Sequence, residues 1–541
     1  MEHRHRSFMT TSGIKNLKFN PRHHQQATKD GLYTSLFFSE KRILAFCMAF
    51  RAINSFLVQT YFNPDEHWQS LEVAHRIVFG YGHLTWEWER GIRSYFHPLM
   101  FALLYKVMAF LGLDTPWFMM KAPRLLQSLI SSVGDLYLYK LSRLIFGDRV
   151  AQFALFSQLL NWFMFFCITR TLSNSIETVL TIMGLYYWNL FLGFSTNALS
   201  SSRKKALFLA ALACAIRPTS AVIWLYVGSL DLLRMPQKLK FLFHEVLPIG
   251  IFVIVINCLL DWWMYGSLTF VAMNFLKFNL FSSGGDYYGT HVWHWYLSQG
   301  FPVIVFTFLP YSLYGIFKSK EWRLSGLIVW VLAIYSILGH KEFRFVLPVL
   351  PIALMFSGYS LAALSPSKQP GLNKGRPSIR CPSRMQLSIL FLIATNVPMA
   401  LYMSLLHQRG SEDVMYYLSK EARDGNVKSV LFLMPCHSTP YYSALHQNLP
   451  MRFLDCTPGH VSGILDESDQ FQINPAGFVL EMFKHVSFPS HIIVFSPQEK
   501  ALLDILASYS FREEKRFFHA HFKVDRDLQG SIAVYFHAAS L

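Results

Sequence analysis

The feature that most constrains this chain is a series of apolar segments that are long enough to cross a bilayer. Windows of roughly 17 to 25 mostly apolar residues, the length that a spanning helix needs, recur along most of the first 410 positions. They predict about eleven membrane-spanning helices. The third is the weakest, because Arg124 and Asp135 interrupt it, and it is also compatible with a re-entrant or interfacial helix. The expected spans lie near residues 43–60, 97–113, 123–144, 151–169, 174–194, 204–227, 242–260, 300–318, 325–340, 345–364 and 386–407.

Composition agrees with a polytopic membrane protein. Of the 541 residues, 52% are hydrophobic and 15% are charged, against roughly 25% charged in typical soluble domains. The net charge of +16 could suggest nucleic-acid binding, but the basic residues are dispersed over loops, and no basic module interleaved with aromatic residues is present. We therefore expect no nucleic-acid partner.

The distribution of Lys and Arg predicts sidedness. Basic residues gather before the first span and in the loops 199–206 and 365–384, so the N-terminus and both loops should be cytosolic. The acidic loop 61–96 should then face the lumen, and an odd number of spans would place the C-terminal part there too. The first apolar run begins too far into the chain for a cleavable signal and should remain as an anchor.

Three segments are expected along the chain. Residues 1–40 form a disordered basic cytosolic arm, residues 41–407 form the transmembrane body with its luminal loop 61–96, and residues 408–541 form a luminal domain. The last segment alternates β-prone runs, "SVLFLMP" and "HIIVFS", with the helix-like "PQEKALLDILASY", which indicates a small α/β domain. Its cysteines, Cys436 and Cys456, are equally compatible with a disulfide and with two free thiols.

Two adjacent carboxylates follow the first span, in "FNPDEHWQSLEV". Apolar residues at helical spacing predict a short amphipathic helix that starts around Asp65 and Glu66. Asp65 could simply cap that helix. His67, Trp68 and further aromatic residues crowd the same loop, and carboxylates amid aromatic rings are typical of a sugar site.

A second polar group, in "GHKEFRFVLP", interrupts two strongly apolar runs. It contains His340, Lys341, Glu342 and Arg344, and ionisable residues at a span boundary are costly unless they pair or bind a ligand. The cationic residues suit a lipid-linked phosphate, which Arg344 could grip with two nitrogens. The alternative is a basic anchor that flanks a helix.

The aromatic loop 274–302 gives a weaker signal. His291, Trp293 and His294 could contact a substrate, but an interfacial aromatic belt explains the Trp residue without any ligand. His291 and His294 alone are too few ligands for a metal ion. Arg170 and Glu177, in "TRTLSNSIETV", could form a polar network facing the lumen or a structural pair between helices.

Taken together, these motifs resemble the glycosyltransferase family 22 enzymes of the endoplasmic reticulum. The resemblance rests on "NPDEHWQSLEVAHRIVFGYGHLTWEWE", "TRTLSNSIETVLT", "GTHVWHWYLSQGFPV" and "HKEFRFVLPVLP", and it runs from about residue 43 to the C-terminus. The resemblance implies an all-α polytopic protein with the GT-C glycosyltransferase fold, about 11 transmembrane helices and a small luminal α/β C-terminal domain. Related N-glycan enzymes carry a second acidic residue where this chain has Phe343, which favours the branch that builds glycosylphosphatidylinositol (GPI) anchors.

The resemblance also implies an activity. A member of this branch transfers the third mannose, in α-1,2 linkage, from dolichyl phosphate mannose to the two-mannose GPI precursor. The family's catalytic acidic pair corresponds to Asp65, the expected base, and Glu66, which would orient the acceptor or the base. His340, Lys341 and Arg344 would bind the donor phosphate. The residues expected around the donor or acceptor are His67, Trp68, Glu342, His291, Trp293 and His294.

The implied partners are dolichyl phosphate mannose, the mannosylated GPI lipid precursor and the lipids of the endoplasmic reticulum membrane, with no metal or other cofactor. Two alternatives compete with this interpretation. One is another mannosyltransferase of the same family, acting in N-glycan assembly or adding the fourth GPI mannose. The other is a polytopic lipid or solute transporter, which would explain the composition equally well.

Overall fold

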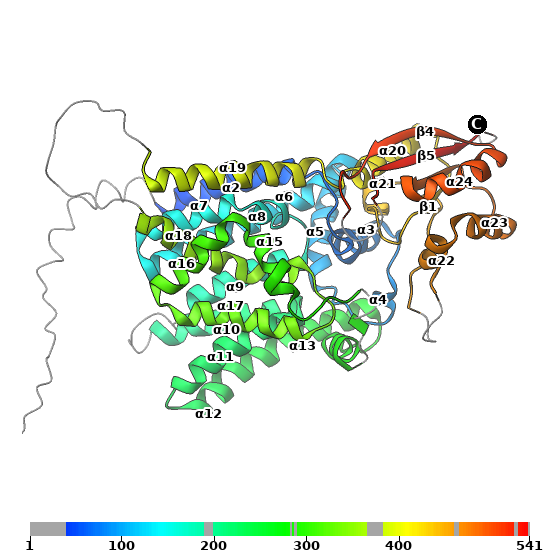
Figure 1. The fold of residues 1–541 in the computed structure, drawn as a ribbon. Coiled ribbons are helices and arrows are strands. Elements are labelled where there is room, and N and C mark those ends of the chain that lie inside the picture. The colour runs from blue at the N-terminus through cyan, green and yellow to red at the C-terminus, as the bar shows by residue number, and fades with distance from the viewer. Residues whose placement is uncertain are drawn as a thin grey trace, which may run out of the picture.

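The chain folds into a bundle of long helices with a small sheet at one end (Figure 1). The computed structural model describes residues 39–188, 198–281, 284–285, 289–364, 382–458, 465–523 and 528–538, so almost all of the predicted arm 1–40 lies outside the described residues. The helices of the body are α2 (Glu40–Leu57), α5 (Phe96–Phe110), α6 (Pro116–Phe146), α7 (Asp148–Leu160), α8 (Trp162–Cys167), α9 (Ser173–Tyr187), α10 (Ala198–Ile216), α11 (Ala221–Arg234), α12 (Lys238–Phe241), α13 (Leu247–Tyr265), α14 (Val271–Leu276), α15 (Phe301–Val305), α16 (Leu309–Ser319), α17 (Trp322–Ile337), α18 (Leu350–Leu364) and α19 (Arg384–Leu405).

Every predicted span overlaps one or more of these helices, with three corrections. The span expected near 300–318 consists of α15 and α16 with a 3-10 turn, Phe306–Phe308, between them. The span expected near 204–227 is divided into α10 and α11 at Pro218–Ser220, because Pro218 has no backbone N–H to continue the helix. The span expected near 151–169 is divided into α7 and α8 at Asn161, whose side chain accepts a hydrogen bond from the N–H of Met164 and so starts a new helix.

The number of membrane crossings stays a prediction. Within the described residues, four helical stretches are long and apolar enough to cross a bilayer: Lys238–Tyr265, Tyr296–Ser319, Phe343–Leu364 and Arg384–Arg423. Two further apolar helices, Phe96–Phe110 and Trp322–Ile337, are shorter. The expected count of about eleven spans is therefore not confirmed by length and composition alone.

The charges that weakened the third predicted span have partners on neighbouring helices. Asp135 of α6 accepts hydrogen bonds from Nε and Nη2 of Arg51 on α2, at 2.6 and 2.9 Å. Gln158 of α7 donates a third, at 3.1 Å. Both ionic side chains are almost completely buried, at 0% and 1% exposure. This ion pair therefore joins α2 to α6 inside the bundle, and α6 continues through both interrupting residues as one helix of 31 residues.

The C-terminal region, residues 408–538, contains the predicted mixture of strands and helices. Its sheet has the order β2-β1-β3-β5-β4, in which β1 pairs in parallel with β2 and β3, and β5 pairs antiparallel with β3 and β4. The strands are β1 (Val430–Leu433), β2 (Met451–Phe453), β3 (His491–Phe495), β4 (Phe511–Phe518) and β5 (Ser531–His537). The helices are α20 (Gly410–Arg423), α21 (Tyr442–Leu445), α22 (Glu467–Ile473), α23 (Pro475–His485) and α24 (Ser496–Ser508).

The two faces of this sheet bury different partners. Leu431, Ile492 and Val494 pack on one face with residues of α23 and α24. Phe432, Ile493 and Val534 pack on the other face with residues of α20 and with Trp68, which belongs to the first loop of the body. The body thus contributes a residue to the core of the C-terminal region.

The C-terminal region lies at the end of the bundle where the first loop also lies (Figure 1). The ordered elements of that loop are a 3-10 turn (Pro64–Glu66), a π-helical turn (His67–Leu71), α3 (Glu72–Phe79) and α4 (Trp86–Glu89). Helix α19 begins at the opposite end of the bundle and leads directly into the C-terminal region. The expected domain boundaries themselves stay a prediction.

The buried pair Arg51–Asp135 makes a prediction about stability. Replacing Asp135 with Asn leaves the Arg51 guanidinium buried without an opposite charge, and breaking a buried ion pair costs about 3–5 kcal/mol. We expect Asp135→Asn to lower the midpoint of thermal unfolding in detergent clearly, as measured by tryptophan fluorescence.

The matched control is Lys140→Gln, which removes a more exposed ion pair between α2 and α6. Lys140 bonds Glu40 at 3.0 Å, but the two side chains are 17% and 43% exposed, and such pairs contribute about 0–1 kcal/mol. An equal loss of stability in both variants would contradict the structural role of the Arg51–Asp135 pair.

Candidate active site

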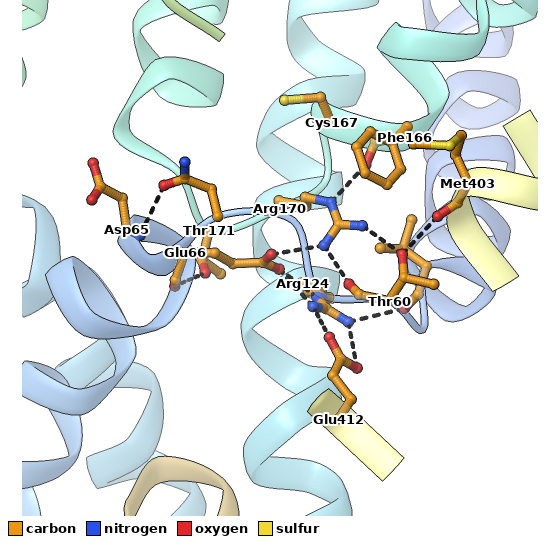
Figure 2. Close-up of polar contacts among 12 residues, drawn as sticks. Thr60, Asp65, Glu66, Arg124, Phe166, Cys167, Arg170, Thr171, Met403 and Glu412 are labelled. Atoms are coloured by element: carbon orange, nitrogen blue, oxygen red, sulfur yellow. Dashed lines mark hydrogen bonds and ion pairs between the residues drawn. The ribbon is translucent and has the colours of Figure 1, made fainter. Parts of the chain in front are cut away.

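The first loop turns sharply after α2 and presents its two carboxylates in different directions. Asn63 caps the 3-10 turn, because its side-chain oxygen accepts the N–H of Asp65 at 3.0 Å. Asp65 is therefore not the capping residue. Figure 2 shows the side chain of Asp65 pointing away from that of Glu66. The side chain of Asp65 is 20% exposed and that of Glu66 is 0% exposed.

Glu66 is held by two guanidinium groups (Figure 2). Its Oε1 accepts from Nε of Arg124 on α6, and its Oε2 accepts from Nη1 of Arg170, which follows α8, each at 2.7 Å. Burial by itself would raise the pKa of Glu66, but Arg124 and Arg170 together lower it below its ordinary value. The carboxylate is therefore ionised and lies inside the protein.

The same two arginines hold the backbone of the loop. Arg170 Nη1 donates to the carbonyl oxygen of Thr60 at 2.6 Å, and Arg124 Nη1 donates to that of Val58 at 3.0 Å. Thr171 Oγ1 donates to the carbonyl oxygen of Glu66 at 2.6 Å. The path of the chain from Val58 to Glu66 is therefore fixed by side chains from α6 and from the segment after α8.

One expected pair is wrong. Arg170 pairs with Glu66 and not with Glu177, the partner considered from the sequence. Glu177 on α9 lies instead 3.0 Å from Nε of Arg217, at the end of α10. The sequence placed Arg170 and Glu177 close together along the chain, whereas Arg170 bonds a residue 104 positions earlier.

Asp65 faces the predicted phosphate-binding turn. Arg344 donates from Nη1 to Asp65 Oδ2 at 2.5 Å, and it donates from Nε and Nη2 to the two oxygens of Glu342 at 2.6 and 2.8 Å. The guanidinium group of Arg344 thus bonds two carboxylates. Asp65 lies 279 positions before Arg344 in the chain, and Glu342 lies 2 positions before it. Burial opposes ionisation of Asp65, but the charge of Arg344 outweighs it and lowers the pKa of Asp65 below its ordinary value.

Two further side chains complete this group. His340 Nε2 donates to Glu342 Oε1 at 3.0 Å, and Asn63 Nδ2 donates to Glu342 Oε2 at 2.9 Å. Burial would lower the pKa of His340, but the hydrogen bond and the charge of Glu342 raise it overall. Glu342 in turn has a pKa far below its ordinary value, because Arg344 and His340 outweigh its burial. Asp65, Arg344 and Glu342 therefore carry alternating negative and positive charges.

Lys341 points to backbone oxygens. Its ammonium group donates to the carbonyl oxygen of Leu338 and to that of His291, the latter at 2.9 Å. The N–H of His291 donates to the carbonyl oxygen of Gly339 at 3.0 Å, so this lysine helps to attach the aromatic loop to the turn.

Of the three aromatic-loop residues expected at the site, His291 adjoins the turn. Trp293 is 69% exposed, and His294 is exposed with its Nδ1 hydrogen-bonded to Ser298 Oγ at 3.1 Å.

His67 and Trp68 are buried beneath the C-terminal region. The ring of His67 stacks on that of Tyr61, 5.6 Å between centroids, and burial lowers its pKa to about 4. Trp68 Nε1 donates to the carbonyl oxygen of Thr439 at 2.9 Å, and its ring packs on His437. Both were expected to contact substrate, and their burial favours a role in packing the loop.

The C-terminal region contacts the first loop next to a disulfide. Cys436 and Cys456 form a disulfide, which settles the question left open by the sequence. Tyr61 donates its hydroxyl hydrogen to the carbonyl oxygen of His437, next to that disulfide. Among the described residues, the one His/Cys/acid group with metal-ligand spacing is Cys436, His437 and Cys456, and the disulfide removes both thiolates from it.

Glu412, in the first turn of α20, is also new to the site. It accepts hydrogen bonds from Arg124 Nη1 and Nη2, and Nη2 also lies 2.7 Å from Oε1 of Glu66 (Figure 2). The available signal was Arg124 itself, since a charge inside a predicted span requires a buried partner. Nothing in the sequence indicated which of the 33 acidic residues would supply it.

Comparisons with known proteins agree over nearly the whole chain. A model described as the Alg9-like mannosyltransferase family matches residues 42–446. The Arabidopsis thaliana protein named mannosyltransferase APTG1 is 62% identical over 506 residues, which cover 92% of this chain and 92% of that protein. The human protein named GPI alpha-1,2-mannosyltransferase 3 is 43% identical over 487 residues, which cover 88% of this chain and 84% of the human protein.

Among solved structures, the crystal structure of ArnT from Cupriavidus metallidurans, bound to undecaprenyl phosphate, has a TM-score of 0.56 to this chain at 13% identity. The match covers 91% of this chain and 97% of that one. This likeness concerns the fold alone, and it confirms the expected GT-C architecture of a membrane glycosyltransferase.

The different surroundings of the two adjacent carboxylates predict different effects on stability. Glu66→Gln removes the negative charge between two buried guanidinium groups, which should cost about 3–5 kcal/mol. Asp65→Asn leaves Arg344 bonded to Glu342, so its effect should be much smaller. We expect the unfolding midpoint of the purified protein in detergent to fall clearly for Glu66→Gln and to change little for Asp65→Asn. The reverse order would contradict the structural role assigned to Glu66.

Proposed function

This chain belongs to the Alg9-like mannosyltransferase family, and we propose that it transfers the third mannose of the GPI anchor, in α-1,2 linkage, from dolichyl phosphate mannose. The acceptor is the GPI precursor that already carries two mannoses. The observation that carries the proposal is the Asp65–Arg344–Glu342 group, in a chain whose relatives include proteins named GPI alpha-1,2-mannosyltransferase 3. Membership of a mannosyltransferase family removes the transporter alternative.

Asp65 is the base of the reaction. The donor is a β-linked mannosyl phosphate and the product is an α-mannoside, so the anomeric carbon is inverted in a single displacement. Such a displacement needs one carboxylate to remove the proton of the attacking acceptor hydroxyl. Asp65 is ionised, because Arg344 lowers its pKa, and it is the partly exposed member of the acidic pair.

The leaving phosphate is stabilised by positive charge. It departs as an anion and needs no proton, in contrast to the sugar alcohol that leaves in glycoside hydrolysis. Arg344 provides cationic N–H donors beside Asp65, His340 bonds Glu342 in the same group and has a raised pKa, and Lys341 adds a positive charge in the same turn. A phosphate bound here competes with Asp65 for Arg344 Nη1, so donor binding frees the base at the moment when it is needed.

Glu342 keeps the cations in place. It accepts from Arg344, His340 and Asn63, and it therefore orients one nitrogen of Arg344 toward Asp65 while it binds the other two. His291 lies at the edge of this group through its backbone bonds to the turn. No step of this reaction requires a metal ion or other cofactor, because the charged residues balance the phosphate.

The site faces the lumen of the endoplasmic reticulum. Two observations support this side. The disulfide Cys436–Cys456 belongs to the region that covers the first loop, and disulfides form in the oxidising lumen and not in the cytosol. The segment that begins α19, which follows the basic loop expected in the cytosol, lies at the opposite end of the bundle (Figure 1).

The role of Asp65 is tested by transfer in microsomes that lack the endogenous enzyme. With dolichyl phosphate mannose and a two-mannose GPI acceptor, Asp65→Asn should reduce transfer by about 10²–10⁴-fold, the usual contribution of a general base. Glu89→Gln, which changes an exposed carboxylate of the same loop, should transfer normally. Because the pKa of Asp65 is lowered, the native enzyme should lose no activity to protonation of this base between about pH 8 and pH 5. Near-normal transfer by Asp65→Asn would remove Asp65 as the base.

The orientation is tested by labelling cysteines in sealed microsomes. With a membrane-impermeant reductant and a polyethylene-glycol maleimide, Cys381 in the expected cytosolic loop should be labelled at once. Cys436 and Cys456 should be labelled only after the vesicles are opened with detergent, because their disulfide lies on the luminal side. Labelling of all three cysteines in sealed vesicles would contradict the proposed orientation.

A further inference from the structure

Glu412 belongs to the C-terminal region and bonds Arg124 of α6, which in turn bonds the first loop. It lies in the first turn of α20, 288 positions after Arg124, and it is 5% exposed. Arg124 donates to both of its oxygens, from Nη1 to Oε2 at 3.1 Å and from Nη2 to Oε1 at a very short distance. The C-terminal region therefore contributes one charge to the group of buried residues at the root of the first loop (Figure 2).

The charges of this group balance only when Glu412 is included. Two guanidinium groups, Arg124 and Arg170, meet two carboxylates, Glu66 and Glu412, and all four side chains are at least nine-tenths buried. Without Glu412, one carboxylate would face two buried cations. Burying an ion without its partner costs several kcal/mol, so Arg124 would turn away from its present position or admit water.

Arg124 links the position of Glu412 to that of Glu66, because its guanidinium group is planar and rigid. Nε and Nη2 face Glu66, while Nη1 and Nη2 face Glu412, so two adjacent edges of the plane are engaged. The orientation that Glu412 imposes on this plane thus fixes where the carboxylate of Glu66 lies. Glu66 is followed by the π-helical turn and preceded by Asp65 within one 3-10 turn, so its position sets that of Asp65.

We propose that Glu412 is a positioning residue for the transfer reaction, acting through Arg124 and Glu66 on the carboxylate of Asp65. The proposal rests on the role of Asp65 as the base. Among the described contacts, Glu412 bonds neither Asp65 nor the residues proposed to bind the donor phosphate. Its loss should therefore reduce turnover and leave donor binding unchanged.

The expected size of the effect follows from geometry. A base must lie within hydrogen-bond reach of the proton that it removes, and a misplacement of about 1 Å can reduce the rate by about 10²-fold. We expect Glu412→Gln in the full chain to lower kcat by about 10–100-fold. The KM for dolichyl phosphate mannose should stay within about twofold of the native value, because Arg344, His340 and Lys341 are unchanged.

The matched control is Glu499→Gln. Glu499 of α24 is a buried carboxylate of the same region, and it accepts from both terminal nitrogens of Arg516, at 2.7 and 2.5 Å. Among the described residues, Glu499 bonds Arg516 of β4 and Tyr535 of β5, which both lie outside the first loop. This variant removes a carboxylate–guanidinium pair from the C-terminal region and should keep native kcat.

A second measurement does not depend on activity. Hydrogen–deuterium exchange of the peptide that covers residues 61–72 should be faster in Glu412→Gln than in the native protein, and unchanged in Glu499→Gln. If Glu412→Gln does not accumulate, Glu412→Asp serves instead. It keeps the charge but withdraws the carboxylate from one nitrogen of Arg124, so it should lower kcat in the same way.

The outcomes separate this inference from the proposed function. Native kcat and native exchange in the Glu412 variant, or an equal loss of kcat in Glu499→Gln, would overturn the positioning role. If that occurs while Asp65→Asn is inactive, the inference alone has failed. If Asp65→Asn transfers mannose normally, the assignment of the base has failed, whatever the Glu412 variants do.

Discussion

Four buried charges at the root of the first loop hold the site together. Glu66, Arg124, Arg170 and Glu412 come from four separate segments of the chain, and each would be costly to bury alone. Once they are paired, the loop backbone between Val58 and Glu66 has one stable path, because both arginines also bond its carbonyl oxygens. The same four residues therefore stabilise the fold and fix the path of the first loop.

A single 3-10 turn places the neighbouring carboxylates of Asp65 and Glu66 in different surroundings. Successive residues in a 3-10 turn are rotated by about 120°, so Asp65 and Glu66 cannot face the same environment. The side chain of Glu66 is fully buried, and each of its oxygens accepts a hydrogen bond from a guanidinium group. Asp65 remains partly exposed beside the His340–Arg344 turn. The acidic pair thus combines a buried structural residue with the proposed base, and Arg344 bonds that proposed base.

The sequence predicted what depends on local pattern and missed what depends on distant contacts. Apolar length predicted the helices, and Pro218, Asn161 and the 3-10 turn Phe306–Phe308 divided three of them unexpectedly. Asp65, His340, Glu342 and Arg344 were predicted, and the structure brings them together. Arg170 was assigned the wrong partner, because the nearer acid, Glu177, is used by Arg217. Glu412 could not be predicted as the partner of Arg124, because no local sequence pattern relates a residue of α20 to one of α6.

The distance of 288 residues between Arg124 and Glu412 has a consequence for biosynthesis. Ribosomes add about 5–20 residues per second, so Arg124 is made roughly 15 to 60 s before its second partner exists. During that interval Glu66, which is already synthesised, is the acid available to both arginines. A nascent chain that stops before residue 412 would leave two guanidinium groups to share the single carboxylate of Glu66 inside the bundle, and an unpaired buried ion costs several kcal/mol.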